Sequence, residues 1–155
     1  MYSNILVAVD DSDTSRHALQ HAIALAQGLA ARLRVVHVID MSWLTLGPEL
    51  AVDVEALTAA RHGVGERIVA AALETVRQAG LDAEAAVIET ETPVQRVEEA
   101  IVKEAGRWPA DLVVLGTHGR RGFQRLVLGS AAEQIARLSP VPVLLVPAPA
   151  EAAAG

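Results

Sequence analysis

The sequence contains no cysteine, and only 3% of its 155 residues are aromatic. The lack of cysteine excludes disulfide bonds and thiolate metal sites, and it fits a reducing compartment. With so few aromatic rings, an apolar core has to be built from aliphatic side chains. No apolar run approaches the roughly 18 to 20 residues of a membrane-spanning helix, and no signal-peptide pattern opens the chain. We therefore expect a cytoplasmic protein that does not interact with membranes.

The sequence also has few basic residues, since it contains 13 basic and 19 acidic residues and its net charge is −6. A protein that binds nucleic acid usually presents a basic face, so nucleic acid is not expected as a partner. The length suits one domain with a core of its own. We expect a single domain over residues 1–147, followed by a flexible C-terminal tail over residues 148–155.

Short apolar runs alternate with segments of helical periodicity. The runs predict five strands, at residues 5–9, 33–39, 83–89, 111–115 and 141–146. The segments between them predict helices that begin at capping residues, namely at one of Ser12, Asp13 and Thr14, at Asp53, at Thr92 and at Ser130. The second of these helices is expected to stop at Gly80, and Gly63 and Gly65 are expected to weaken it locally.

This alternation predicts an α/β fold, with a five-stranded parallel open sheet and helices on both faces. Such sheets bind ligands beyond the carboxyl ends of their strands, where the order of the strands reverses. For five strands the reversal is expected beside the first strand, which points to Asp10 and to the residues that follow Leu115. Pro142 has no amide hydrogen, so the fifth strand is expected at an edge of the sheet.

A glycine-rich segment follows the fourth predicted strand. Gly116, Gly119 and Gly122 fall within its first seven residues, and Gly129-Ser130 lies where the next helix begins. Glycine allows backbone amides to approach a phosphate closely, and a helix N-terminus adds unpaired amides. The same residues also suit an ordinary connecting loop, and the chain has neither a Walker-type loop nor a dinucleotide fingerprint. The residues by themselves leave phosphate binding and a plain loop as equal alternatives.

The chain resembles the universal stress protein family over nearly its whole length. Segments similar to the first, second and fourth strands of that family are Ile5–Asp10, Val36–Ile39 and Asp111–Gly116. The most specific likeness is the spacing of a glycine, two residues, a glycine, nine residues and Gly-Ser. Here it is met by Gly116, Gly119, Gly129 and Ser130, and in the family it marks the branch that binds ATP.

The resemblance implies an adenine nucleotide alpha-hydrolase-like, Rossmann-like fold that holds ATP together with Mg²⁺. It implies an adenine pocket lined by Ala8, Val9, Val38 and Leu115. It implies contacts with the phosphates from Gly116, His118, Gly119, Arg120, Gly122, Gly129, Ser130, Ala131 and Ala132. Asp10 would hold the ribose or a metal ion near the phosphates, although Asp10 and Asp11 also suit a turn that caps the first helix.

Two positions depart from the family pattern. Ala8 stands where a proline is frequent, and Asp11 stands where a glycine is frequent. The negative charge of Asp11 beside Asp10 would either help to bind a metal ion or weaken the binding of an anion, and the sequence leaves both alternatives open. No cluster typical of a ligand site is formed by the histidines outside the glycine-rich segment, which are His17, His21, His37 and His62.

These features favour a regulatory module of the stress response that binds ATP and signals through a partner or its own assembly. The resemblance implies a homodimer, and the predicted edge strand Val143–Val146 is its expected contact. One alternative is a slow ATPase or a related nucleotide-handling enzyme; others are a binder of AMP or cyclic AMP in the same pocket and a dimer without a ligand. Because no defined base accompanies the arginines, we expect no catalytic residue and at most weak ATP hydrolysis.

Overall fold

The computed structural model describes residues 1–46, 53–117 and 130–149. Its strands are β1 (Asn4–Ala8), β2 (Arg32–Ile39), β3 (Glu84–Glu89), β4 (Leu112–Gly116) and β5 (Val143–Val146). Its helices are α1 (Asp13–Leu29), the short 3-10 helix η1 (Ser42–Leu46), α2 (Val54–Gln78), α3 (Val97–Arg107) and α4 (Ser130–Leu138).

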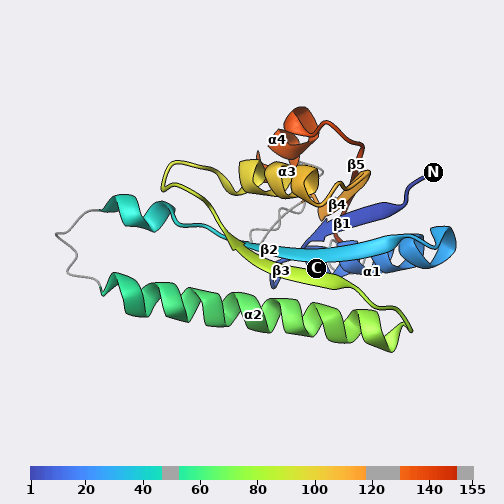
Figure 1. The fold of residues 1–155 in the computed structure, drawn as a ribbon, viewed down its shortest axis with the longest axis horizontal. Coiled ribbons are helices and arrows are strands. Elements are labelled where there is room, and N and C mark those ends of the chain that lie inside the picture. Colours follow the sequence, from blue (N-terminus) through green and yellow to red (C-terminus); the bar gives the residue numbers. More distant parts are fainter. Residues whose placement is uncertain (47–52, 118–129, 150–155) are drawn as a thin grey trace.

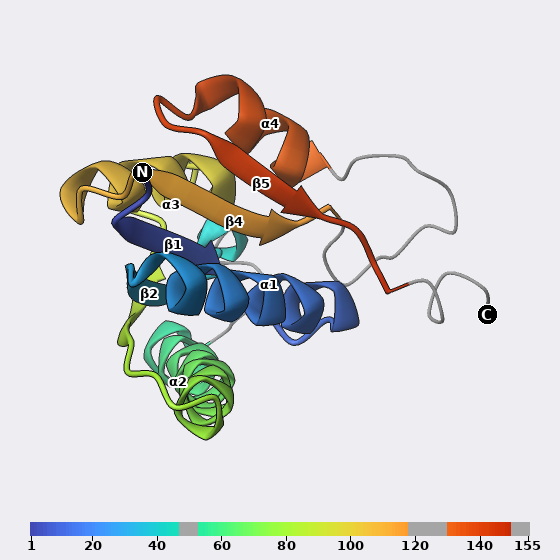
Figure 2. The ribbon, with the colours of Figure 1, turned by 90° about the vertical axis from the view of Figure 1, so that its right-hand side faces the viewer.

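The five strands form one parallel sheet in the order β3-β2-β1-β4-β5. The chain runs outwards from β1 through β2 to β3, returns to the other side of β1, and runs outwards again through β4 to β5. Helices α1 and α2 cover one face of the sheet, and α3 and α4 cover the other (Figures 1 and 2). The predicted α/β fold is confirmed, with the reversal beside β1 and with β5 at an edge, although β5 begins at Val143 and not at residue 141.

Side chains alternate between the two faces of the sheet and build one apolar core on each. Ile5 and Val7 of β1 face α1 and α2, where Leu19 and Val35 join them. The core beneath α3 and α4 contains Leu6, Val36, Ile101, Val113 and Ile135. Because Ile5, Leu6 and Val7 are all 0% exposed, β1 is enclosed from both sides.

Two predicted helix starts are confirmed by their caps. The Ser12 hydroxyl accepts a hydrogen bond from the Ser15 amide at 3.1 Å, and the Asp53 carboxylate accepts one from the Ala56 amide at 3.0 Å. Helix α2 ends two residues before Gly80. The φ of Gly80 is +82°, a conformation that favours glycine, so the predicted stop is confirmed as well.

The helix start predicted at Thr92 is wrong, because α3 begins only at Val97. The Gln95 amide does donate to the Thr92 hydroxyl at 3.0 Å, as in a capping box. The Gln95 side chain, however, accepts from the amide of Glu91 and not from that of Thr92. Since Arg96 then has an extended backbone, with φ −85° and ψ 155°, these hydrogen bonds close a turn and the helix starts after it.

Helix α2 lies very close to the sheet at Gly65. A Cβ atom at Gly65 would be 2.9 Å from Cγ1 of Val87 and 3.1 Å from Cδ2 of His37. At Gly63, two residues earlier, the nearest atom would be Arg67 Nη1 at an ordinary 3.7 Å. The two glycines therefore differ in role, because only Gly65 is required for the packing of α2 on β2 and β3.

We predict opposite effects of alanine at these two glycines. Gly63→Ala should raise the free energy of unfolding by about 0.5–1 kcal/mol, because alanine favours the helix and restricts the unfolded chain. Gly65→Ala should lower it by about 1–3 kcal/mol, because the added methyl group overpacks the contact with Val87. Urea denaturation of both variants measures the difference, and equal stabilisation by both would contradict the close approach at Gly65.

A cluster of charged side chains ties β2, β3 and α3 together around Glu84. The Glu84 carboxylate accepts from Trp108 Nε1 at 3.0 Å and from Arg32 at 2.6 Å. The Arg34 guanidinium forms ion pairs with two carboxylates, that of Glu84 at 3.5 Å and that of the buried Glu104 at 2.9 Å. The hydrogen bond from Trp108 is the main cause that lowers the pKa of Glu84, with Arg32 acting in the same direction and desolvation opposing both.

Removing the indole should make this contribution visible as a pH dependence. Because the pKa of Glu84 is lower in the folded chain, its ionised form stabilises the protein above the usual value of 4.5, and that stabilisation fades as the pH falls through the folded pKa. The stability lost in Trp108→Phe should thus be largest at neutral pH and smaller in acid. Urea denaturation between acid and neutral pH measures this loss of stability. In a Glu84→Gln background, the loss caused by Trp108→Phe should no longer depend on pH. A loss that is independent of pH in both backgrounds would contradict the role assigned to Trp108.

Candidate functional site

The carboxyl ends of β1, β2 and β4 open onto a cavity of about 210 Å³ on the side of α3 and α4. β1 and β4 are neighbours here, and the chain turns in opposite directions after them. Residues predicted for the site that line this cavity are Ala8, Val9, Asp10, Val38, Leu115, Gly116, Ala131 and Ala132. The structure therefore brings residues from four separate segments of the chain to one place.

Some of the predicted residues do not line the cavity or fall outside the description. Ser130 is the first residue of α4, next to the lining residues Ala131 and Ala132, but it is not itself a lining residue. Outside the described residues lie His118, Gly119, Arg120, Gly122 and Gly129. Their contacts with phosphate stay predictions.

Asp10 forms a tight turn that leads from β1 into α1. Its carboxylate accepts from the Ser12 amide at 2.8 Å, and its own amide donates to the Ser15 hydroxyl at 2.8 Å. Ser12 in turn caps α1 through the Ser15 amide. The turn interpretation of Asp10 is confirmed, and the half-buried Asp10 also lines the cavity, so the two interpretations are compatible.

His37 lines the same cavity and was not expected there. Its Nδ1 lies 2.8 Å from the carbonyl oxygen of Val9. Because a carbonyl oxygen only accepts, Nδ1 carries the hydrogen and donates it. This bond holds the end of β2 against the end of β1, directly beside Val38, and the only sequence signal for it was that His37 adjoins a predicted site residue.

The other lining residues that sequence reasoning missed are Ser15, Val97, Ile101, Thr117 and Ile135. Val97 and Ile101 stand one turn apart on α3, a spacing that in sequence indicates only a helix face turned to a core. Their place beside β1 results from the packing of α3 on the sheet. Together with Ala8, Leu115 and Ile135 they make most of the cavity wall apolar, whereas Asp10, Ser15 and Thr117 supply polar groups.

Gly116 stands at the end of β4, pressed against the first turn of α1. A Cβ atom at Gly116 would lie 2.5 Å from Cγ2 of Thr14 and 3.2 Å from the Thr14 backbone carbonyl. Thr14 is buried, so it has no room to move aside. Glycine is therefore required here by packing, independently of any contact with a phosphate.

Helix α4 begins beside the cavity, where Ala131 and Ala132 of its first turn form part of the wall. The amino end of a helix carries partial positive charge and unpaired amides. Negative charge at this end of the cavity would thus be stabilised. The arrangement suits a ligand with an apolar ring against the aliphatic wall and an anionic group near α4.

The described residues contain neither a metal-binding cluster nor a membrane-spanning helix. No group of three or more His, Cys, Asp or Glu side chains that could hold a metal ion occurs in this part of the chain. None of the described helices is both long enough and apolar enough to span a membrane.

Comparison with known proteins gives a consistent family. The model of the universal stress protein family matches residues 1–147. The chain is 30% identical over 149 residues to the universal stress protein MJ0531 of Methanocaldococcus jannaschii, with 96% of this chain and 84% of that protein covered. It is also similar to the crystal structure of a universal stress protein family member from Burkholderia pseudomallei, with 33% identity, a TM-score of 0.78, and coverage of 95% and 97%.

Two further solved structures contain adenine nucleotides. A universal stress protein in complex with cAMP is 25% identical, with a TM-score of 0.65 and coverage of 96% of this chain and 98% of that chain. A universal stress protein of Archaeoglobus fulgidus in complex with dAMP shares the fold, with a TM-score of 0.66 at 22% identity and coverage of 94% and 98%. The family match over residues 1–147, the curated relative and the sheet order agree, and this chain belongs to the universal stress protein family.

Proposed function

We propose that this chain is a regulatory module of the stress response that binds ATP in the cavity at the ends of β1, β2 and β4. The observation that carries the proposal is the meeting of Asp10, Val38, Leu115 and the first turn of α4 around one cavity at the strand-order reversal. The glycine spacing of Gly116, Gly119, Gly129 and Ser130 supports the phosphate end. Similar chains that hold cAMP and dAMP support adenine as the base.

The adenine ring is proposed to lie against the aliphatic wall beside Val38. The Val36 carbonyl accepts from the Val9 amide at 2.8 Å, so it points toward β1. Backbone groups alternate in direction along a strand, so the peptide groups of Val38 point to the same side, past the last residue of β1. A base with donors and acceptors along its edge can hydrogen-bond to a backbone in that position.

The ribose and the phosphates are proposed to extend from Val38 across Asp10 toward α4. One oxygen of the Asp10 carboxylate is engaged by the Ser12 amide, and a carboxylate has several acceptor sites that remain for sugar hydroxyls. Mg²⁺ would be held mainly by the phosphates, with Asp10 as the carboxylate assigned to it, because magnesium commonly keeps its waters and uses substrate phosphates. No described side chain is assigned a catalytic role.

Nucleotide binding should depend on the cavity wall at the start of α4. Ala131 lines the cavity yet is exposed, so Ala131→Phe intrudes on the ligand at little cost to the fold. Ala136→Phe, on the exposed side of the same helix, is the matched control. In titrations of protein stripped by unfolding and refolding, ATP affinity should fall by about tenfold or more in Ala131→Phe and stay unchanged in Ala136→Phe.

Comparison of ligands in the same titrations separates the alternatives. ATP should bind more tightly than AMP and cAMP, and the double variant Gly119→Val with Gly129→Val should remove that preference. Equal affinity for all three would contradict a phosphate site, and preference for cAMP would support the cyclic nucleotide alternative. A folded, stripped protein that binds none of them even at millimolar concentration would overturn the proposal, and turnover of bound ATP would favour a slow ATPase.

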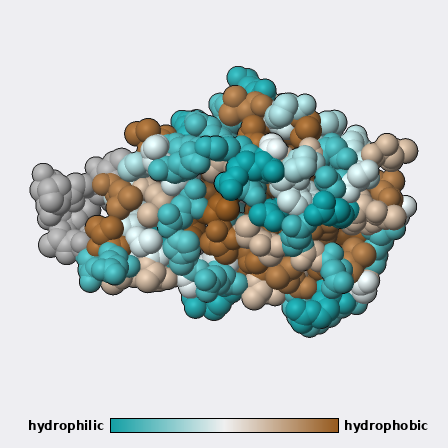
Figure 3. Space-filling model, viewed as in Figure 1, coloured by the Kyte–Doolittle hydropathy of each residue, from teal (hydrophilic) through white to brown (hydrophobic). Residues whose placement is uncertain are grey.

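We further propose that two copies pair through β5. Among the described residues, no further strand pairs with the outer edges of β3 and β5, but β3 begins and ends with charged residues, Glu84 and Glu89. Antiparallel pairing of β3 with itself would place Glu84 of one copy opposite Glu89 of the other. Like charges in that position are unfavourable, although Arg32 offsets part of the charge of Glu84. Hydrophilic side chains also interrupt the apolar surface on the face of Figure 3, which carries α2, β3 and α3. β5 has no charged residue, and its Leu144 is 36% exposed.

A charge at Leu144 should separate the two copies. In antiparallel pairing of β5 with itself, each Leu144 would lie opposite a Leu145, so Leu144→Lys would bring two ammonium groups into one small apolar contact. Sedimentation should show a dimer for the natural chain and a monomer for Leu144→Lys. Leu138→Lys, at an exposed apolar position on α4, is the control and should remain dimeric; dissociation of both variants or of neither would contradict a β5 contact.

A further inference from the structure

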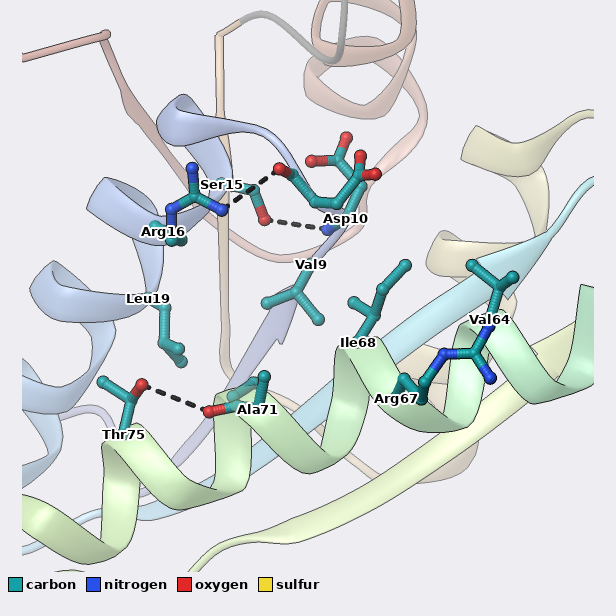
Figure 4. Close-up of a pocket in the computed structure, with 12 residues that line it drawn as sticks. Val9, Asp10, Ser15, Arg16, Leu19, Val64, Arg67, Ile68, Ala71 and Thr75 are labelled. Atoms are coloured by element: carbon teal, nitrogen blue, oxygen red, sulfur yellow. Dashed lines mark hydrogen bonds between the residues drawn. The ribbon is translucent and has the colours of Figure 1, made fainter.

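A second and larger cavity, of about 280 Å³, lies on the other face of the sheet, between α1 and α2 (Figure 4). Its walls are formed mainly by Val9, Leu19, Ile68, Ala71 and Ala72. In Figure 4 Val9, Leu19 and Ile68 project into the space between the two helices. None of the adenine nucleotide contacts proposed above requires this space.

The cavity exists because α2 turns small side chains toward α1. Ala71 and Ala72 stand where longer side chains would fill the space between the helices. Thr75, at one end, donates its hydroxyl to the carbonyl of Ala71 at 3.2 Å, so its polar group is satisfied within α2. The interior therefore favours an aliphatic or aromatic body and offers few polar partners to it.

Both acidic and basic side chains line this cavity, and the acidic ones are Asp10 and the exposed Asp11. Arg16 of α1 and the exposed Arg67 of α2 both line it, and in Figure 4 the Arg67 guanidinium extends along α2 toward Val64, which lines the cavity too. Arg16 is engaged by the Asp13 side chain and by the Asp11 carbonyl at 3.2 Å. The guanidinium of Arg67 has no hydrogen bond or ion pair within the described residues. The Asp10 carboxylate is turned away from α2 in Figure 4, toward the Ser12 amide that it accepts from.

We propose that this cavity binds an amphipathic monoanion, with its hydrocarbon body against Leu19, Ile68 and Ala71 and its carboxylate on Arg67. An apolar cavity of about 150 Å³ takes up benzene, so this one suits a body and headgroup of about ten heavy atoms. A guanidinium without a partner at the mouth of an apolar cavity selects a carboxylate over a neutral or cationic group. The proposal stands on this cavity alone and does not require nucleotide binding.

The two cavities meet at one turn of the chain. Val9, Asp10 and Ser15 line both of them. The hydrogen bond from the Asp10 amide to the Ser15 hydroxyl therefore joins the walls of the two sites. If the nucleotide proposal holds, a ligand between α1 and α2 should alter nucleotide affinity, and the nucleotide should alter the affinity of that ligand by the same factor.

Octanoate, which has the expected size and charge, is the probe for this site. Its addition to the full chain, followed by amide NMR, should give saturable shifts that centre on Val9, Leu19, Ile68 and Ala71. Octanol should bind about tenfold more weakly and octylammonium more weakly still, because neither has a carboxylate for Arg67. Equal binding of the three compounds, or shifts scattered over the surface, would overturn the proposal.

Matched variants on α2 test the two parts of the site separately. Ala71→Leu fills the cavity and should abolish saturable binding. Ala70→Leu should leave it intact, because both alanines are exposed but only Ala71 lines the cavity. Arg67→Gln should weaken octanoate about tenfold without affecting octanol, and Arg77→Gln, further along the same helix, should change neither. Loss of octanoate binding in the controls as well would overturn the site.

Nucleotide titration of the same samples keeps this proposal distinct from the previous one. Octanoate binding in a protein that binds no adenine nucleotide would retain the cavity site and reject the nucleotide module. ATP binding without saturable octanoate binding would reject the cavity site and retain the nucleotide module.

Discussion

The enclosure of β1 on both faces and along both edges is the constraint on which the rest of the structure depends. β1 pairs with β2 on one side and with β4 on the other, and its three central side chains have no exposed surface. Parallel neighbours on both sides require crossover helices on both faces. The two halves of the chain therefore diverge at the carboxyl end of β1, and the turn at Asp10 lies in the space that this divergence leaves open.

Much of this arrangement could be predicted because it depends on local patterns. Apolar runs marked the strands, and the rule for ligands at strand ends pointed to Asp10 and to the residues after Leu115. Val38 and Leu115 themselves were expected in the site only because the chain resembles the universal stress protein family. The position of Ile101 could not be predicted, since it depends on how α3 packs against strands distant in sequence. The start of α3 was predicted wrongly because Thr92 and Gln95 form a capping type of hydrogen bond that here closes a turn.

The roles of two glycines, Gly65 and Gly116, were predicted poorly from the sequence. Gly65 was expected to weaken a helix, yet it allows α2 to approach Val87 and His37 closely. Gly116 was expected to serve a phosphate, yet it is already required by its contact with Thr14. Replacing Gly116 would disturb packing before it disturbed a ligand, so loss of binding at this position would not by itself identify a phosphate contact. Variants at Ala131, which is exposed, are easier to interpret.

The different chemistry of the two sheet edges also limits how the molecule can grow. A sheet with two equally available edges can add copies at both and extend into a fibre, whereas one with a single available edge is finished after one addition. Here glutamates stand at both ends of β3, and β5 is short, uncharged and enclosed between Pro142 and Pro147. The pairing proposed through β5 would therefore end at two copies, because the glutamates of β3 make the second edge unsuited to adding another.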